Sequence, residues 1–198
     1  MLASLSLLIA GCVGVGVFPT DDAFQKLNDA EQLFQRDLRA LIAENLIWEA
    51  KEIGEAEGNY HLLGNVFHTY ADFLSSSAVE KWNKFYRENG FKDESITFEN
   101  RKEKSEEYLE KASEFYDLGA QQLVQSKEYD KLTNLYLNAA IVMQKMDKDE
   151  MACGYLDRAI EAAEENILNN PQADPYAPQG YGNVQEYLEA MKESFDCM

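Results

Sequence analysis

Residues 136–159 read YLNAAIVMQKMDKDEMACGYLDRA, and this stretch decides the fold. Apolar and small residues recur three or four places apart in each half, which is the period of an α-helix and not of a strand. The charged segment around Asp147 separates the two halves. The pattern therefore predicts one helix from Lys131 to Met146 and a second from Asp149 to Asn166, joined by a short turn that makes them antiparallel.

The order of small and large residues in this pair resembles that of a tetratricopeptide repeat. It reads Tyr136-x-x-Ala139-Ala140-x-x-Met143 in the first helix and Ala152-x-x-x-Leu156-x-x-Ala159 in the second. In that family the small residues let two helices approach closely, and the large residues fill the space between repeats. The resemblance implies antiparallel hairpins stacked side by side. Helical-hairpin repeats of the SNAP type, which have longer helices, stay open as an alternative.

A second, partial match begins at Tyr60. Tyr60-x-x-Leu63-Gly64-x-x-Phe67 resembles the first helix of another repeat. Its second helix is degenerate, because Ser76 stands where a small alanine is expected and Trp82 is displaced. Phe115-x-x-Leu118-Gly119 also fits a first helix, yet it begins 21 residues before Tyr136. That distance is one helix and not one repeat, so the register there is ambiguous.

Helical spacing continues through most of the remaining chain. Further helical patterns cover residues 22–53, as one long helix or two, and residues 60–74, 79–86, 108–123 and 184–195. Residues 90–104 are polar, and residues 169–182 hold three prolines and two glycines, so both are predicted to be connections. Asp21 or Asp22 is placed to cap the first helix, and Asn183 to cap the last. The prediction is an all-α fold of stacked antiparallel helical hairpins in one domain over residues 21–198, with a helical bundle as the alternative.

The composition excludes some partners. Hydrophobic residues make up 45% of the chain, which is enough to build a core. Thirty-six acidic residues stand against 18 basic residues, for a net charge of -18. This field repels the phosphate backbones of nucleic acids and attracts basic partners. Nucleic-acid binding is therefore not expected, and self-association stays open.

The N-terminal segment has no charged side chain before Asp21. It reads MLASLSLLIAGCVGVGVFP over residues 1–19. Within it, Leu8-Ile9-Ala10-Gly11-Cys12 resembles the lipobox of prokaryotic lipoproteins. The resemblance implies that residues 1–20 are a signal and anchor segment, that a lipid is attached to Cys12, and that the protein is held at the periplasmic face or cell surface. No Lys or Arg precedes the apolar run, which departs from the usual signal, and an uncleaved membrane anchor is the alternative.

Cys153 and Cys197 are the remaining cysteines. An even pair is compatible with one disulfide in an oxidising compartment, and equally with two free thiols. Cys153 stands in a helical stretch, where a small half-buried residue is ordinary packing, so free thiols are favoured.

Motifs for catalysis are missing from the sequence. It contains no Gly-rich phosphate loop, no Gly-x-Ser-x-Gly, no Cys-x-x-Cys and no His-Glu-x-x-His. The two histidines, His61 and His68, stand seven places apart and would need a carboxylate such as Asp72 to complete a metal site. We therefore expect no enzyme, no cofactor and no metal.

A binding face follows from the repeat resemblance alone. In tetratricopeptide repeats, fixed positions after the first aromatic residue of the first helix point into a concave groove. The corresponding residues are His61, Asn65, His68 and Thr69 after Tyr60, and Leu137, Ile141, Gln144 and Lys145 after Tyr136. The side chain of Asn65 can grip a peptide backbone with both donor and acceptor. The two histidines would gain charge as the pH falls toward 6.5. Ordinary solvent-facing polar side chains are the alternative.

The functional expectation combines these features. It is a lipid-anchored helical-repeat protein that binds a protein or peptide partner in a groove at the cell envelope, with basic partners favoured. The alternative is a structural subunit of a membrane-associated complex or a homo-oligomer, in which no groove is free. A polar concave groove would favour the first reading, and a large exposed apolar patch would favour the second.

Overall fold

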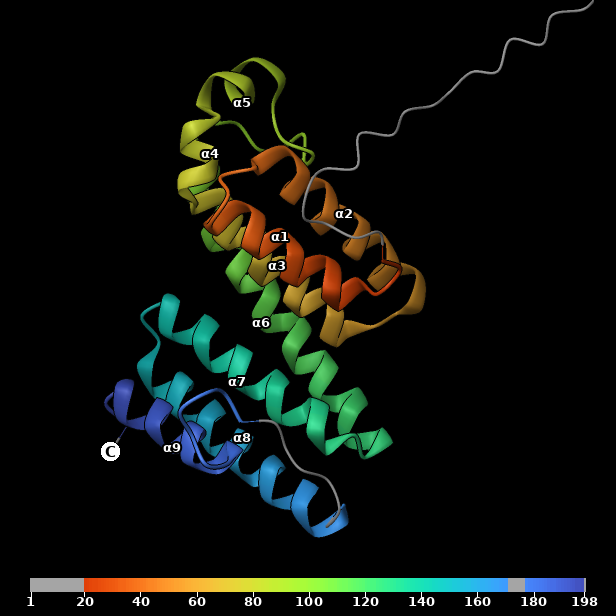
Figure 1. The fold of residues 1–198 in the computed structure, drawn as a ribbon, viewed down its shortest axis with the longest axis vertical. Coiled ribbons are helices and arrows are strands. Elements are labelled where there is room, and N and C mark those ends of the chain that lie inside the picture. Colours follow the sequence, from red (N-terminus) through yellow and green to blue (C-terminus); the bar gives the residue numbers. More distant parts are fainter. Residues whose placement is uncertain (1–19, 171–176, 198) are drawn as a thin grey trace, which may run out of the picture.

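The computed structural model describes residues 20–170 and 177–197 (Figure 1). These residues form nine helices and no strand, which confirms the all-α prediction. None of the helices in the described part is long and apolar enough to cross a bilayer. The predicted anchor segment, with Cys12, lies outside the described residues.

Six of the helices pack as three successive pairs. The pairs are α1 (Ala23–Gln35) with α2 (Ala40–Glu57), α3 (Tyr60–Ser75) with α6 (Arg101–Ser126), and α7 (Tyr129–Lys145) with α8 (Asp149–Asn169). Adjacent pairs are joined by packing of α2 on α3 and of α6 on α7. In addition, α3 contacts both α1 and α7, so the first helices of the three pairs are neighbours. The predicted stack of helix pairs is therefore present, and the last pair has the predicted boundaries within three residues.

Local residue chemistry explains where the first helices begin and end. The Asp22 carboxylate accepts hydrogen bonds from the backbone N–H groups of Phe24 and Gln25 at 2.9 and 3.1 Å, which caps α1. Leu38 has a positive φ of 53°, so the chain breaks there and residues 22–53 form two helices. Gly58, with a φ of 61°, ends α2 in the left-handed conformation that glycine adopts without strain.

The middle pair differs from the predicted hairpin. Two short helices, α4 (Ser77–Lys81) and α5 (Asn83–Asn89), and an irregular segment separate α3 from α6. The helix that packs along α3 is α6, and not the stretch near Ser76 and Trp82 where the repeat pattern placed it. This pairing is possible because Gly119 on α6 has no side chain. An added Cβ there would lie only 2.9 Å from the backbone nitrogen of His61 on α3. The backbones of α3 and α6 thus cross at very close range.

The segment between α5 and α6 is more than a polar connection. Phe91, Ile96 and Phe98 from this segment are buried in the core. The buried carboxylate of Glu44 on α2 accepts a backbone N–H from Lys92 at 2.8 Å, and it also accepts the hydroxyl groups of two core tyrosines. Burial raises the pKa of Glu44, while these hydrogen bonds act in the opposite direction. The segment is therefore anchored to the first helix pair.

The chain closes with α9 (Val184–Ser194), which packs on α8 and buries Leu188. Asn183 caps it as predicted, by accepting the backbone N–H of Glu186. Cys153 and Cys197 form a disulfide, with their Cα atoms 5.5 Å apart. The expectation of two free thiols was therefore wrong, because helical periodicity does not show that α9 folds back along α8.

Candidate functional site

The first helices of the three pairs surround a pocket of about 290 Å³. Four of its lining residues belong to α1, four to α3 and three to α7. They are Phe24, Leu27, Asn28 and Glu31, then Asn65, His68, Thr69 and Asp72, then Asn138, Ile141 and Lys145. The stacking of the pairs brings together residues that are more than 100 positions apart in the sequence. We call this pocket the central pocket.

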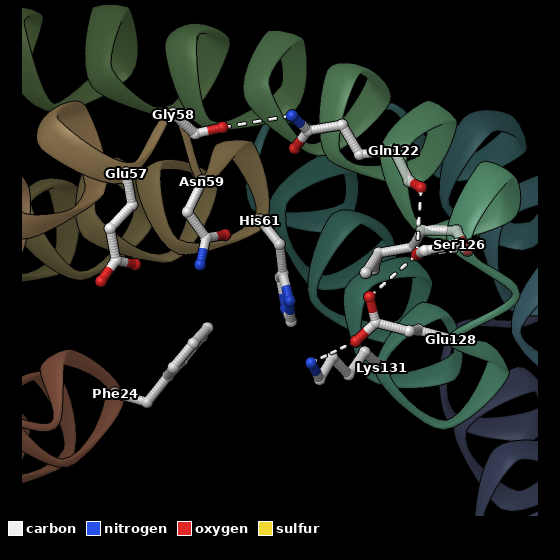
Figure 2. A pocket seen from close by; sticks show the side chains of 10 residues that line it. Phe24, Glu57, Gly58, Asn59, His61, Gln122, Ser126, Glu128 and Lys131 are labelled. Carbon is white, nitrogen blue, oxygen red and sulfur yellow. Dashed lines mark hydrogen bonds and ion pairs between the residues drawn. The ribbon is translucent and has the colours of Figure 1, made fainter.

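A second pocket, of about 370 Å³, lies at the N-terminal end of α3 (Figure 2). Its walls come from α1, from the turn between α2 and α3, and from the facing ends of α6 and α7. The lining residues are Phe24, Glu57, Gly58, Asn59, His61, Gln122, Leu123, Ser126, Glu128 and Lys131. We call it the end pocket. Phe24 lines both pockets, so the two lie next to each other along α3, and we refer to them together as the groove.

Most of the residues predicted for the binding face line this groove. Asn65, His68, Thr69, Ile141 and Lys145 line the central pocket, and His61 lines the end pocket. The other two predicted residues line neither pocket. Leu137 is half-buried and packs against the core, and Gln144 is exposed.

A closed polar network occupies one wall of the central pocket. The Lys145 ammonium group donates to both carboxylate oxygens of Asp72 at 2.6 Å, and it lies 2.9 Å from His68 Nε2. The hydroxyl of Tyr116 lies 3.5 Å from His68 Nδ1, so the imidazole is contacted on both sides. Polar contacts in this wall of the central pocket therefore link α3, α6 and α7.

The side-chain amide of Asn65 is already engaged inside the protein. Its oxygen accepts from the side-chain nitrogen of Asn138 at 2.9 Å and from the Tyr116 hydroxyl at 3.3 Å. Its nitrogen donates to the backbone carbonyl of His61 at 2.9 Å. The oxygen of Asn65 therefore links α3 to α6 and α7, and one of its amide hydrogens bonds within α3, which leaves one N–H for a peptide.

The two histidines are neutral near neutral pH. Burial and the charge of Lys145 lower the pKa of His68 to about 4, although Asp72 opposes the shift. Burial and Lys131 lower the pKa of His61 to about 4 in the same way. The expectation that these side chains gain charge near pH 6.5 is corrected, since desolvation disfavours the imidazolium form.

The groove carries more negative than positive charge. Four carboxylates line it, from Glu31, Glu57, Asp72 and Glu128, together with two lysines. Lys145 pairs with Asp72, and Lys131 pairs with Glu128. Within the described part of the chain, Glu31 and Glu57 therefore have no cationic partner. The charge in the groove that is not balanced by an ion pair is negative, which is also the sign of the net charge of the chain.

Sequence reasoning missed the contribution of α1, as well as Asn138. Helix α1 carries no repeat motif, so nothing aligned Phe24, Asn28 or Glu31 with the positions that line a groove. The order of the helices could have revealed this contribution. If residues 22–53 form a helical hairpin that turns at Leu38, the stacking of hairpins places its first helix beside α3 and α7. Asp72 was considered only as a metal ligand.

A metal role for these residues gains no support from their geometry. The described residues contain no group of three or more His, Cys, Asp or Glu side chains able to hold a metal ion. The imidazole nitrogen His68 Nε2 lies 3.7 Å from Asp72 Oδ2, and the Lys145 ammonium group contacts both of these groups.

Comparison with protein-family models, with curated proteins and with solved structures finds no match.

Proposed function

We propose that this chain is a helical-repeat binding protein, anchored by lipid at the cell envelope, that holds a peptide or protein partner in the groove along α3. The observation that carries the proposal is the groove itself, in which α1, α3 and α7 form the central pocket and the end pocket lies next to it. Binding sites in proteins are typically concave, with apolar walls and a few well-placed polar groups. The central pocket is concave and more polar than this average, with Phe24, Leu27 and Ile141 as its apolar residues.

The charge of the groove favours a basic partner. Glu31 and Glu57 bring unpaired carboxylates to its lining, and the whole chain has a net charge of -18. A field of this sign accelerates encounter with cations and is screened by salt. Binding of the partner is therefore expected to weaken as ionic strength rises.

The location at the envelope rests on the lipobox resemblance and gains support from the disulfide. Disulfides persist in oxidising compartments, such as the periplasm and the cell surface, and are rare in the cytosol. The bond between Cys153 and Cys197 fits the proposed location.

Acylation of Cys12 is tested by intact-mass spectrometry of the protein from its native host. The mass of the mature protein should include lipid on Cys12 and lose it in Cys12→Ala, whereas an unmodified chain starting at Met1 would contradict the anchor.

A structural subunit is the second candidate, and one observation favours it. Leu168, near the end of α8, is 75% exposed, and its neighbour Ile167 is 44% exposed. Large contiguous apolar patches mark interaction sites, and these two neighbouring side chains would form part of such a patch. Sedimentation of the full chain over a range of concentrations tests it. Self-association that is lost in Leu168→Ser would favour this candidate, and a monomer at all concentrations would disfavour a homo-oligomer.

Site-specific photo-crosslinking in the native envelope tests the binding proposal. A photoreactive amino acid replaces Thr69, which lines the central pocket, or Gln121, which is exposed on α6 outside both pockets. The proposal predicts a discrete crosslinked partner from position 69 and none from position 121. Crosslinks from Gln121 alone, or from neither position, would contradict the assignment of the groove.

A further inference from the structure

One wall of the end pocket carries an imidazole whose nitrogens have no hydrogen-bond partner in the described part of the protein. His61 is 9% exposed, and neither of its ring nitrogens has a hydrogen bond within the described residues. Figure 2 shows the ring pointing from α3 into the pocket. The ring nitrogens open into the pocket, so they are accessible to solvent or to a bound group. A ligand in the end pocket would supply the partner.

The imidazole offers a hydrogen-bond acceptor to such a ligand. Because burial and Lys131 lower the pKa of His61 to about 4, the ring is neutral under ordinary conditions. A neutral imidazole has one N–H donor and one nitrogen with a free lone pair. The phenyl ring of Phe24 lies beside it, with ring centroids 5.2 Å apart.

Two other groups around the pocket are free to interact. The Glu57 carboxylate is exposed and has no partner within the described residues. The ring of Phe24 is 39% exposed, so an aromatic surface faces the pocket. Figure 2 shows Glu57, Asn59 and His61 in a row, with Phe24 opposite them.

Most of the remaining polar groups of the pocket are engaged within the protein. Asn59 is engaged through its side-chain oxygen alone, which accepts the backbone N–H of Leu62 at 3.0 Å, and its amide nitrogen stays available as a donor. Gln122 donates to the Gly58 carbonyl at 3.1 Å and accepts from the Tyr60 N–H at 3.3 Å. Lys131 pairs with Glu128, which also accepts the Ser126 hydroxyl at 2.8 Å. The positive charge of Lys131 is thus offset within the pocket. What remains for a ligand is the Glu57 carboxylate, the imidazole of His61, the ring of Phe24 and the amide nitrogen of Asn59.

We propose that the end pocket binds the guanidinium group of an arginine side chain in the partner. A guanidinium has five N–H donors and no acceptor, so it matches a site of free acceptors. It is also planar and stacks on aromatic rings, which fits Phe24. Glu57 accepts from one side of the guanidinium and His61 from another. This inference rests on the proposed function, because it names the residue type that the groove selects.

Titration of the full chain with two peptides tests the inference. The probes are acetyl-Gly-Arg-Gly-amide and the same peptide with citrulline, which keeps the shape of arginine but has no charge. Binding is followed by NMR chemical-shift changes at millimolar peptide concentrations. We expect the arginine peptide to bind roughly tenfold more tightly, as is typical of hydrogen bonds to a charged group.

Variants assign the binding to the end pocket. Glu57→Gln should weaken the arginine peptide by roughly fivefold to tenfold. Glu52→Gln removes the same charge from an exposed position on the same helix outside the pocket, and it should have little effect. His61→Phe keeps a ring of similar shape but removes the acceptor, and it should also weaken binding. Unfolding of each variant by heat checks that the fold is intact.

Three results would overturn the arginine site. They are equal affinity for the two peptides, equal loss in Glu57→Gln and Glu52→Gln, and no binding of the arginine peptide. None of these removes the proposed function, because photo-crosslinking at Thr69 reports on the central pocket independently of arginine. Conversely, a charge-selective end pocket with no crosslink at Thr69 would support the arginine site and contradict the larger groove.

Discussion

Gly64 on α3 lies directly against the ring of Tyr116 on α6, so that an added Cβ would be 2.5 Å from Tyr116 Cδ1. The tyrosine is fully buried, and its hydroxyl contacts Asn65 at 3.3 Å and His68 at 3.5 Å. Because Gly64 has no side chain, Tyr116 can lie where its hydroxyl reaches Asn65 and His68 in the wall of the central pocket. Packing between α3 and α6 and the shape of the groove are coupled at this contact.

Replacement of Gly64 by alanine is expected to destabilise the protein. The Cβ must displace a fully buried ring, and overpacking of this kind costs about 1 to 3 kcal/mol. The measurement is chemical unfolding of the purified chain. Gly154→Ala on α8 is the matched control, because no atom lies within 4 Å of an added Cβ there. The control should be neutral or slightly stabilising, since alanine is the better helix former. Equal behaviour of the two variants would contradict the close contact.

Ala140 on α7 and Ala152 on α8 are both fully buried. Enlargement of either to leucine should overpack the contact between the helices and lower the free energy of unfolding by about 1 to 3 kcal/mol. Thermal or chemical unfolding measures the change. If both replacements leave the stability unchanged, neither alanine lies at a tight helix crossing.

The disulfide between Cys153 and Cys197 should stabilise the C-terminal part of the chain. It joins residues 44 positions apart, and closing a loop of this length restricts the unfolded chain by about 4 kcal/mol in the chain-entropy description. A reducing agent should therefore lower the unfolding temperature of the wild-type protein. Cys197→Ser should already unfold at the lower temperature and should not respond to the reducing agent. A response of the variant equal to that of the wild type would contradict the bond.

His61 and His68 should make stability depend on pH. Their pKa is about 4 in the folded protein and near 6.5 in the unfolded chain, so the unfolded state binds more protons between these values. Stability is therefore full above pH 6.5 and falls as the pH decreases toward 4. The loss is about 3 kcal/mol for each histidine, from 1.36 kcal/mol per unit. The groups that face them are Lys131 and Glu128 for His61, and Lys145 and Asp72 for His68.

The double variant His61→Gln, His68→Gln isolates this effect from the carboxylates. Its free energy of unfolding in urea should change less than that of the wild type between pH 7 and pH 4, because neither glutamine takes up a proton. Parallel pH profiles of the two proteins would show that both histidines titrate normally in the folded state.

The sequence predicted most of the helices well because they show a periodic apolar face, whereas the single stretch predicted over residues 79–86 forms two short helices, α4 and α5. The last pair of helices and the Asn183 cap were predicted near their observed boundaries for this reason. The pairing of α3 with α6 was not predicted, because an insertion of about 25 residues separates them and periodicity carries no information on long-range pairing. The same limit hid the disulfide between Cys153 on α8 and Cys197, which follows α9.

For the groove, most of the residues that the repeat resemblance selected on α3 and α7 line a pocket, but the pattern did not give the state of their side chains. Thr69 and Ile141 line the central pocket, as the pattern implied. The engagement of Asn65 with Asn138 and Tyr116 depends on three helices meeting, which no single helix pattern contains. The lowered pKa of each histidine depends on burial, which likewise follows from the packing of the pairs.

Selection of random displayed peptides on the full chain tests the central claim most directly. Selected peptides are then measured on the wild type and on two tryptophan variants. Thr69→Trp fills the central pocket, and Gln121→Trp adds the same bulk on α6 outside the groove. We predict selected sequences rich in arginine and lysine, with affinity at least about tenfold weaker for Thr69→Trp and unchanged for Gln121→Trp. Peptides that bind all three proteins equally would contradict a binding groove along α3.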